Sequence, residues 1–325
     1  MRPLPRPAVA TGMAVGIVAI STSAILARLA MGDDPGVVSS GPGAAPALGV
    51  AFWRTCLGAL ALAPFGWRAA RRAGVALDAR THRRLAASGL ALGLHFALFQ
   101  GSLALTTVAS AVTLVAMSPV FVALGGWWFL REATDRRTWV GMSLTILGAI
   151  TIGIADASAI DLGRQALLGD AMAFGGAVAV SVYLLLGRYA RRTVPATTYS
   201  AIVYGWAAVG LLVTALVTGT DLLGYDPAAW AAIGGIVVGP QLLGHTVFNA
   251  LLSTVSATVV SIVVLAEPVG AGVLAWLVLE ELPPALFYLG APLVLLGLVV
   301  ATARPRSARP TGAATVTRGP SEEER

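Results

Sequence analysis

The sequence predicts an all-α integral membrane protein of ten transmembrane helices, arranged as two inverted five-helix repeats around a central cavity. Three observations support this fold class: long apolar segments, the distribution of charge between them, and an internal repeat. Hydrophobic residues make up 57% of the 325 positions and charged residues only 12%. This composition excludes a soluble domain, whose surface would need far more polar residues.

Ten apolar segments are long enough to cross a hydrocarbon core of about 30 Å as helices that rise about 1.5 Å per residue. Lipid offers no hydrogen bonds to the backbone, so each segment is expected to be helical, and the absence of alternating polarity argues against a barrel. The predicted spans are residues 8–30, 47–65, 85–105, 109–130, 138–154, 167–187, 197–217, 229–251, 257–279 and 284–302.

Charge alternates between the loops. All 22 basic residues are arginines, and nearly all those in loops and termini fall on one predicted side, in residues 1–7, 66–84, 131–137 and 188–192 and in the tail. The other loops carry acidic residues, among them Asp33, Asp156, Asp221 and Glu280. Cytoplasmic loops of membrane proteins are enriched in basic residues, so both termini are predicted to be cytoplasmic. Residues 1–7 form the cytoplasmic N-terminus, 155–166 an external linker and 303–325 a disordered cytoplasmic tail.

The chain contains an internal repeat. A shift of 149 residues aligns Phe99-Gln100 with Phe248-Asn249, Pro119 with Pro268, Glu132 with Glu281, Gly141 with Gly290 and Gly148 with Gly297. A shift of 160 aligns the first helices, with Gly16 on Gly176 and Ser21 on Ser181. Residues 8–154 and 167–302 are therefore predicted to be two five-helix copies. Because five is odd, the copies enter the membrane from opposite faces, which is the basis of alternating access in many transporters. The alternative is that duplication only enlarged a membrane scaffold.

Four segments resemble one known family. The second-helix arginine in "FWRTCLGAL", then "SPVFVALGGWWFLRE", "GDAMAFGGAVAVSVYLLLGRYARR" and "GHTVFNALLSTVSATVVSIVVLAEPVGAGVLAWLVLEE" are similar to the EamA-like branch of the drug/metabolite transporter superfamily. The resemblance covers residues 8–302. It implies a ten-helix fold around a central cavity and secondary transport rather than ATP-driven transport. It names no substrate, because the family spans amino acids, other metabolites and toxic compounds.

Several polar residues lie at predicted bilayer depth, where charge is costly and normally faces a wet interior. Glu267 precedes Pro268 near the middle of segment 257–279. Its carboxyl group could exchange a coupling proton, or it could bond to backbone groups freed by the proline. Both interpretations stay open. Arg54 lies about eight residues into its segment, where either a structural ion pair or a carboxylate-binding role is expected.

A solute site is predicted between the halves. His245 and Asn249 are one helical turn apart, and His95 and Gln100 occupy similar places on the third segment. Amides and neutral imidazoles donate and accept hydrogen bonds, which suits a zwitterion or a polar neutral solute. The alternative is that they only join helices. The resemblance adds Tyr183, Tyr204 and Trp206, which fall on helices that line the cavity in the family. Glu132 and Glu281, at helix ends, are expected to cap or pair structurally.

The leading functional hypothesis is a secondary transporter, in the exporting direction, for an amino acid, a related metabolite or a toxic compound. The alternatives are a nucleotide-sugar or lipid-linked-sugar carrier of the same fold and, with less support, a membrane-embedded transferase. The expected partners are a small-molecule solute, the lipid bilayer and protons as coupling ion, with no nucleic acid. No catalytic residue, cofactor or metal site is predicted, since the chain has one cysteine, Cys56, and no phosphate-binding motif with lysine.

Overall fold

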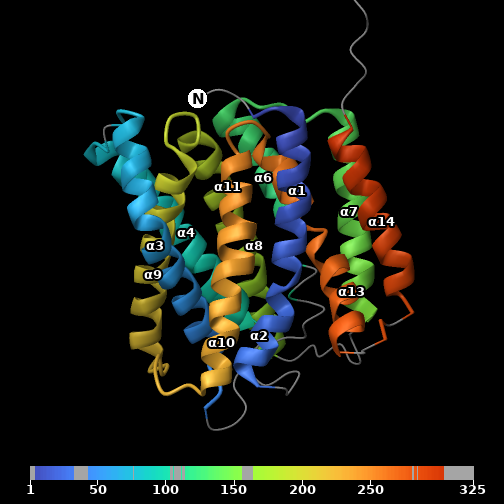
Figure 1. Cartoon of the computed structure of the whole chain (residues 1–325). Coiled ribbons are helices and arrows are strands. Elements are labelled where there is room, and N and C mark those ends of the chain that lie inside the picture. The colour runs from blue at the N-terminus through green and yellow to red at the C-terminus, as the bar shows by residue number, and fades with distance from the viewer. Residues whose placement is uncertain are drawn as a thin grey trace, which may run out of the picture.

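The structure is a computed structural model that describes residues 4–32, 43–75, 77–102, 105, 111, 114–155, 164–279, 282–283 and 285–303. All the regular elements of this described part are helices (Figure 1). They are α1 (Arg6–Ser21), α2 (Ser23–Met31), α3 (Ala47–Arg72), α4 (Ala79–Ser102), α6 (Ser118–Gly125), η1 (Gly126–Leu130), α7 (Arg136–Ala155), α8 (Arg164–Ala190), α9 (Ala196–Thr218), α10 (Pro227–Ile236), η2 (Val237–His245), α11 (Thr246–Leu251), α12 (Ala257–Val264), α13 (Glu267–Leu279) and α14 (Phe287–Thr302).

Six helical stretches of the described part are long and apolar enough to cross a membrane. They are Arg6–Met31, Ala47–Arg72, Leu167–Ala190, Ala196–Thr218, Pro227–Leu251 and Ala257–Leu274. Ser118–Leu130 and Phe287–Thr302 are shorter apolar helices. The all-helical membrane class predicted from composition is confirmed, and the count of ten spans stays a prediction.

Three of the long stretches are interrupted where the sequence weakens the helix. At Thr22 the hydroxyl group donates to the Ala19 carbonyl at 2.7 Å, and this bond competes with the backbone ladder between α1 and α2. Between α12 and α13 the turn comes just before Pro268, which lacks an N–H and crowds the preceding turn. In η2 the helix widens to π geometry around Pro240. Irregular backbone of this kind frequently marks functional sites.

The helices of the two predicted repeats, residues 8–154 and 167–302, pack between one another. α3 packs on α9, α4 on α8, α1 on η2, α6 on α12, and α7 on α14. The α7 and α14 helices lie side by side at one edge of the bundle (Figure 1). The largest buried core joins both parts and contains Tyr183, Tyr199, Tyr204 and Phe248.

Glycines allow α7 and α14 to approach closely. A Cβ atom on Gly141 would lie 2.5 Å from the Gly297 carbonyl oxygen, and one on Gly148 would lie 2.6 Å from the Gly290 carbonyl oxygen. Such distances are too short for any real side chain, so only glycine fits at these four positions. The partner number falls from 297 to 290 as α7 advances from 141 to 148, so the two helices run antiparallel.

The loop arginines of the described part gather at one end of the bundle. There Arg84, at the start of α4, donates to the Tyr189 hydroxyl group at 3.3 Å, and Arg188 pairs with Glu132. The start of α1 and the end of α14 lie at this same end (Figure 1). We call it the arginine-rich end. At the opposite end the Asp226 amide donates to the Gly43 carbonyl at 2.8 Å, and the Trp53 indole donates to the Leu222 carbonyl at 2.7 Å.

Candidate functional site

Arg54 is the most unusual side chain in the interior. It lies on α3 and is only 7% exposed. Its Nε donates to Oε1 of Gln241 at 3.0 Å, its Nη1 donates weakly to the Ser23 hydroxyl group at 3.5 Å, and its guanidinium lies 4.9 Å from the centre of the Phe96 ring. Arg54 therefore joins α2, α3, α4 and η2 at one point.

Gln241 was not among the residues predicted from the sequence. It is fully buried on η2, directly after Pro240. A Cβ atom on Gly58 would lie 2.9 Å from its Cγ, so the glycine makes room for the amide on α3. The signal that could have found it was present: an amide at bilayer depth is costly unless it has partners or a function.

The two predicted histidines flank the same aromatic ring. His95 Nδ1 lies 2.9 Å from the Gly176 carbonyl oxygen, and its ring lies against Phe96 with centroids 5.4 Å apart. The His245 ring meets Phe96 edge to face, with centroids 6.1 Å apart. Both histidines interact electrostatically with Arg54. The histidines and the arginine thus form one polar cluster around Phe96.

Glu267 begins α13, directly before Pro268, where the structure interrupts segment 257–279. Its carboxyl group interacts electrostatically with Arg54, and its backbone carbonyl accepts a weak hydrogen bond from the Ser21 hydroxyl group at 3.5 Å. Ser21 is two residues from Ser23, which accepts a bond from Arg54. The break between α1 and α2 therefore brings the acidic and the basic group into one region. We call Arg54, Gln241, His95, His245 and Glu267 the central polar cluster.

Asn249 lies in a second network, which meets the central polar cluster where the Tyr204 hydroxyl group donates to the Gln241 carbonyl at 3.4 Å. It is fully buried on α11. Its Oδ1 accepts from the Tyr183 hydroxyl group, and its Nδ2 donates to the Ser200 hydroxyl group at 3.1 Å and to the Tyr204 hydroxyl group at 3.4 Å. These bonds use both N–H donors of the amide and one acceptor site of its oxygen. Asn249, Tyr183 and Tyr204 thus meet each other, and this arrangement favours a role in joining α8, α9 and α11.

Two predicted site residues stand apart from these groups. The Trp206 indole on α9 packs edge to face against His82 at the start of α4, with Nε1 3.2 Å from Nε2 of that histidine. Trp206 therefore lies near the arginine-rich end. The side chain of Gln100 lies outside the described part of the structure, so its place in the predicted site stays a prediction.

The arginine-rich end contains an ion-pair network. Arg188 Nε donates to Glu132 at 2.9 Å, its Nη1 donates to the Leu252 carbonyl at 2.7 Å, and Arg192 reaches the same glutamate at 3.4 Å. The structural pairing expected for Glu132 is thereby confirmed, while Glu281 lies outside the described residues. Arg191, just after α8, donates to the Asn249 carbonyl at 2.9 Å. Burial lowers the pKa of Arg191 to about 10, so its guanidinium stays charged at neutral pH.

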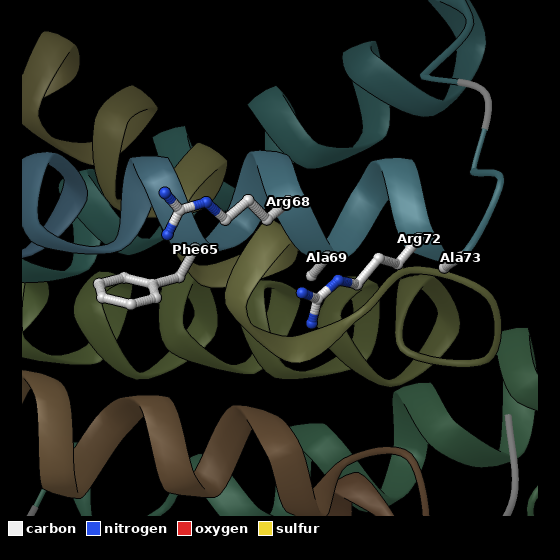
Figure 2. Close-up of a pocket in the computed structure, with 5 residues that line it drawn as sticks. All are labelled: Phe65, Arg68, Ala69, Arg72 and Ala73. Atoms are coloured by element: carbon white, nitrogen blue, oxygen red, sulfur yellow. The ribbon is translucent and has the colours of Figure 1, made fainter.

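A hollow of about 510 Å³ lies at the last turns of α3, lined by Phe65, Arg68, Ala69, Arg72 and Ala73 (Figure 2). Its nearest lining residue, Phe65, is about three turns of α3 from Arg54, or roughly 16 Å at 1.5 Å per residue. It is therefore not the predicted central cavity, which stays a prediction. Among the described residues no group of three or more His, Cys, Asp or Glu side chains is placed to hold a metal ion.

Comparison with known proteins identifies the family. The model of the EamA-like transporter family matches the chain twice, over residues 13–154 and 167–303. The chain belongs to the EamA-like transporter family. The resemblance noted in the sequence is confirmed, and this EamA-like chain is a membrane protein of a transporter family rather than of a known enzyme family.

Several curated relatives are transporters. The EamA-like chain is 26% identical to the pseudopaline exporter CntI of Pseudomonas aeruginosa over 277 residues, which cover 85% of this chain and 93% of the relative. It is 24% identical to the uncharacterized transporter YwfM of Bacillus subtilis over 216 residues, 62% of this chain and 67% of the relative. An uncharacterized transporter of Archaeoglobus fulgidus is 24% identical over 221 residues, 68% of this chain and 75% of the relative.

A solved structure shares the fold. It superposes with a TM-score of 0.73 at 18% sequence identity, and the match covers 92% of this chain and 97% of the other. The helices of the EamA-like chain are therefore arranged as in an experimentally determined structure.

Proposed function

We propose that this EamA-like chain is a secondary transporter that exports a small organic solute, an amino acid or a related metabolite, across the cytoplasmic membrane by alternating access. The central polar cluster carries the proposal. It places a buried arginine and a buried amide together with two histidines and a glutamate that are partly buried, in a bundle whose halves interleave. Desolvated polar groups of this kind mark solute and ion pathways in membrane proteins. The exporting direction rests on the similarity to CntI.

Contacts between equivalent positions support inverted halves. At the 149-residue shift Gly141 corresponds to Gly290, and Gly148 corresponds to Gly297. The contact of Gly141 with Gly297 and the contact of Gly148 with Gly290 are therefore equivalent to each other. Gly16 lies against Phe248, and its counterpart Gly176 lies against Phe99. A twofold relation requires such exchanged pairs. Because α7 and α14 are counterparts and run antiparallel, a twofold axis that relates them lies in the membrane plane. We propose that the ten apolar segments are the ten spans of this arrangement.

We place the arginine-rich end, with both termini, in the cytoplasm, because basic residues are enriched on that side of membrane proteins. Reporter fusions test this orientation. Fusions after residues 75 and 134 should report a cytoplasmic location, and those after 36, 160 and 222 an external one. The reverse pattern at two or more sites would overturn the orientation.

Glu267 is the proposed carrier of the coupling proton. It lies at a helix break, where the backbone of α12 and α13 can adjust, and it interacts with the one charged guanidinium of the cluster. A proton on Glu267 would release Arg54 from this attraction, and its loss would restore the attraction. Such a change in a buried charge can bias one conformation over another.

Transport in proteoliposomes tests the function. Purified protein is reconstituted and the uptake and efflux of labelled amino acids, nucleosides and drugs are measured with and without a pH gradient. The wild type should move at least one solute class faster than empty liposomes do, with acceleration by the gradient. No movement of any solute by correctly folded protein would refute secondary transport.

The Glu267→Gln variant tests the coupling role. An amide preserves the shape of the side chain but does not titrate, so gradient-driven transport should be lost while solute exchange in the absence of a gradient remains. Asp221→Asn is the matched control, because Asp221 is exposed and accepts the Tyr225 hydroxyl bond through its backbone carbonyl. Gradient-driven transport by Glu267→Gln at the wild-type rate would exclude the coupling role.

A further inference from the structure

Two buried donors in the central polar cluster have no acceptor. Nη2 of Arg54 and Nε2 of Gln241 are inaccessible to solvent and make no hydrogen bond to any described residue. The two atoms flank one hydrogen bond, since Arg54 Nε donates to Oε1 of the same Gln241 amide at 3.0 Å. The unused donors therefore lie side by side, one from α3 and one from η2.

A buried donor without an acceptor loses its bond to water and gains nothing in return, and this cost is larger when the group is charged. Native proteins keep such atoms where a ligand or a function compensates for them. The group that fits two adjacent donors, one of them on a guanidinium, is a carboxylate, which has two oxygens and a negative charge. Neutral amides and hydroxyls supply one good acceptor and no charge.

We propose that Arg54 Nη2 and Gln241 Nε2 together bind the carboxylate group of the transported solute. This inference rests on the proposed function and names the chemical class of its substrate. The remaining hydrogen bonds keep the two donors in place. Arg54 is anchored by Ser23 and by the Phe96 ring, and Gln241 is seated in the space left by Gly58.

The backbone around Gln241 also suits a binding role. Gln241 lies within the π-helical segment η2, directly after Pro240, where the regular ladder is relaxed. Its own carbonyl oxygen accepts from the Thr246 hydroxyl group at 3.1 Å and from Tyr204 at 3.4 Å. The backbone of Gln241 is thus fixed by α9 and α11, while its side-chain amide is left with a free donor beside Arg54.

A structural role for Arg54 makes a different prediction. If Arg54 only balances the charge of Glu267, its replacement should alter stability without altering the choice between solutes. The carboxylate assignment requires a change in that choice. The test therefore measures selectivity between molecules that differ only in the carboxylate.

The first measurement uses acetate and acetamide as probes. Purified full-length protein in detergent is melted with 100 mM sodium acetate, or with 100 mM acetamide plus 100 mM sodium chloride. Ligands that bind the folded state raise the melting temperature. Acetate should stabilise the wild type and acetamide should not. Equal effects of the two probes on the wild type would overturn the proposal, whatever the variants do.

Two variants and one control locate the effect. Gln241→Glu keeps an acceptor for Arg54 Nε but replaces the free donor by an anionic oxygen, and it should weaken acetate binding at least tenfold. Arg54→Lys keeps the positive charge but removes the planar guanidinium with its paired N–H donors, and it should also weaken acetate binding at least tenfold. Arg71→Lys is the same substitution on the same helix at an exposed position, where Arg71 packs on the Trp67 ring at 4.1 Å, and it should leave the acetate effect unchanged.

Transport then separates this inference from the function. In proteoliposomes, amino acids are compared with their amides, such as leucine with leucinamide. Preference for the carboxylate by tenfold or more, reduced to threefold or less in Gln241→Glu, supports the proposal. Transport of solutes without any carboxylate preference would overturn the carboxylate site and leave the transporter function intact. An acetate effect without transport of any solute would instead refute the transporter function.

Discussion

The crossing of α7 and α14 offers a sharp test of the packing. In the Gly148→Ala variant the new Cβ atom would lie 2.6 Å from the Gly290 carbonyl oxygen and 2.7 Å from the Val294 amide nitrogen. Ordinary contact begins near 3.4 Å. The two backbones would have to separate by nearly 1 Å, because neither atom belongs to a side chain that can rotate away. Overpacking of this kind costs about 1–3 kcal/mol.

Gly234→Ala is the matched control for this substitution. Gly234 lies inside α10, and its added Cβ atom would meet no other atom within 4 Å. Alanine is a better helix former than glycine by about 1 kcal/mol, so this variant should be neutral or more stable. The measurement is the melting temperature of the purified protein in detergent, followed by tryptophan fluorescence. Gly148→Ala should melt below the wild type and Gly234→Ala at or above it.

The same crossing predicts coupling between two substitutions. Gly290→Ala meets the Gly148 carbonyl oxygen at 2.7 Å, so either alanine forces the same separation. Once one alanine has moved the helices apart, the second should cost less, and the double variant should be more stable than the sum of the single effects implies. Melting of Gly148→Ala at the wild-type temperature, or strictly additive losses, would refute the close backbone contact between α7 and α14.

Three further outcomes follow from the described contacts. Glu132→Gln should weaken the contact between residue 132 and Arg188 and so increase maleimide labelling of a cysteine introduced at the arginine-rich end, and unchanged labelling would show that the ion pair does not stabilise that end. Asn249→Leu should lower the melting temperature by leaving three hydroxyl groups without their amide, whereas Thr151→Val, at a hydroxyl bonded only within its own helix, should not; equal losses would contradict the network. Asp135→Ala should destabilise the protein by about 1 kcal/mol at pH 7 through loss of the α7 N-cap. Because the Thr138 bond lowers the pKa of Asp135, the wild type should lose this advantage in chemical unfolding as pH falls below 3.8, and a constant difference would contradict the cap.

The positions of these helical segments could be predicted from the sequence, because a helix that crosses lipid needs only sufficient length and apolar side chains. The segment predicted at 197–217 is α9, Ala196–Thr218, and the one at 284–302 contains α14, Phe287–Thr302. The expectation that Pro268 frees backbone groups was also local in origin, and the structure interrupts the helix there. The break at Thr22 was not predicted, because a Ser-Thr-Ser sequence competes with the helix ladder only where packing lets its hydroxyl groups turn back.

The sequence predicted at what depth the site residues lie, but it did not predict which of them contact each other. The sequence predicts Arg54, His95, His245 and Glu267 at bilayer depth; the structure groups them, and their roles in the solute site stay predictions. It gave no means of pairing Arg54 with Gln241, which is 187 positions away. Asn249 was predicted to face the solute, yet its bonds to the Tyr183 and Ser200 side chains depend on how α8, α9 and α11 pack, which no local pattern encodes.

Different kinds of interaction stabilise the two ends of the bundle. The arginine-rich end contains an ion pair between Glu132 and Arg188 whose side chains are 26% and 17% exposed, so dissolved ions can screen it. The opposite end joins residues 43–53 to 222–226 by bonds between neutral groups, from the Trp53 indole and the Asp226 amide to backbone carbonyls. Dissolved salt should therefore weaken the contacts at the arginine-rich end more than those at the opposite end. Under the proposed alternating access, the ionic strength around the protein would then set how tightly one end is held relative to the other.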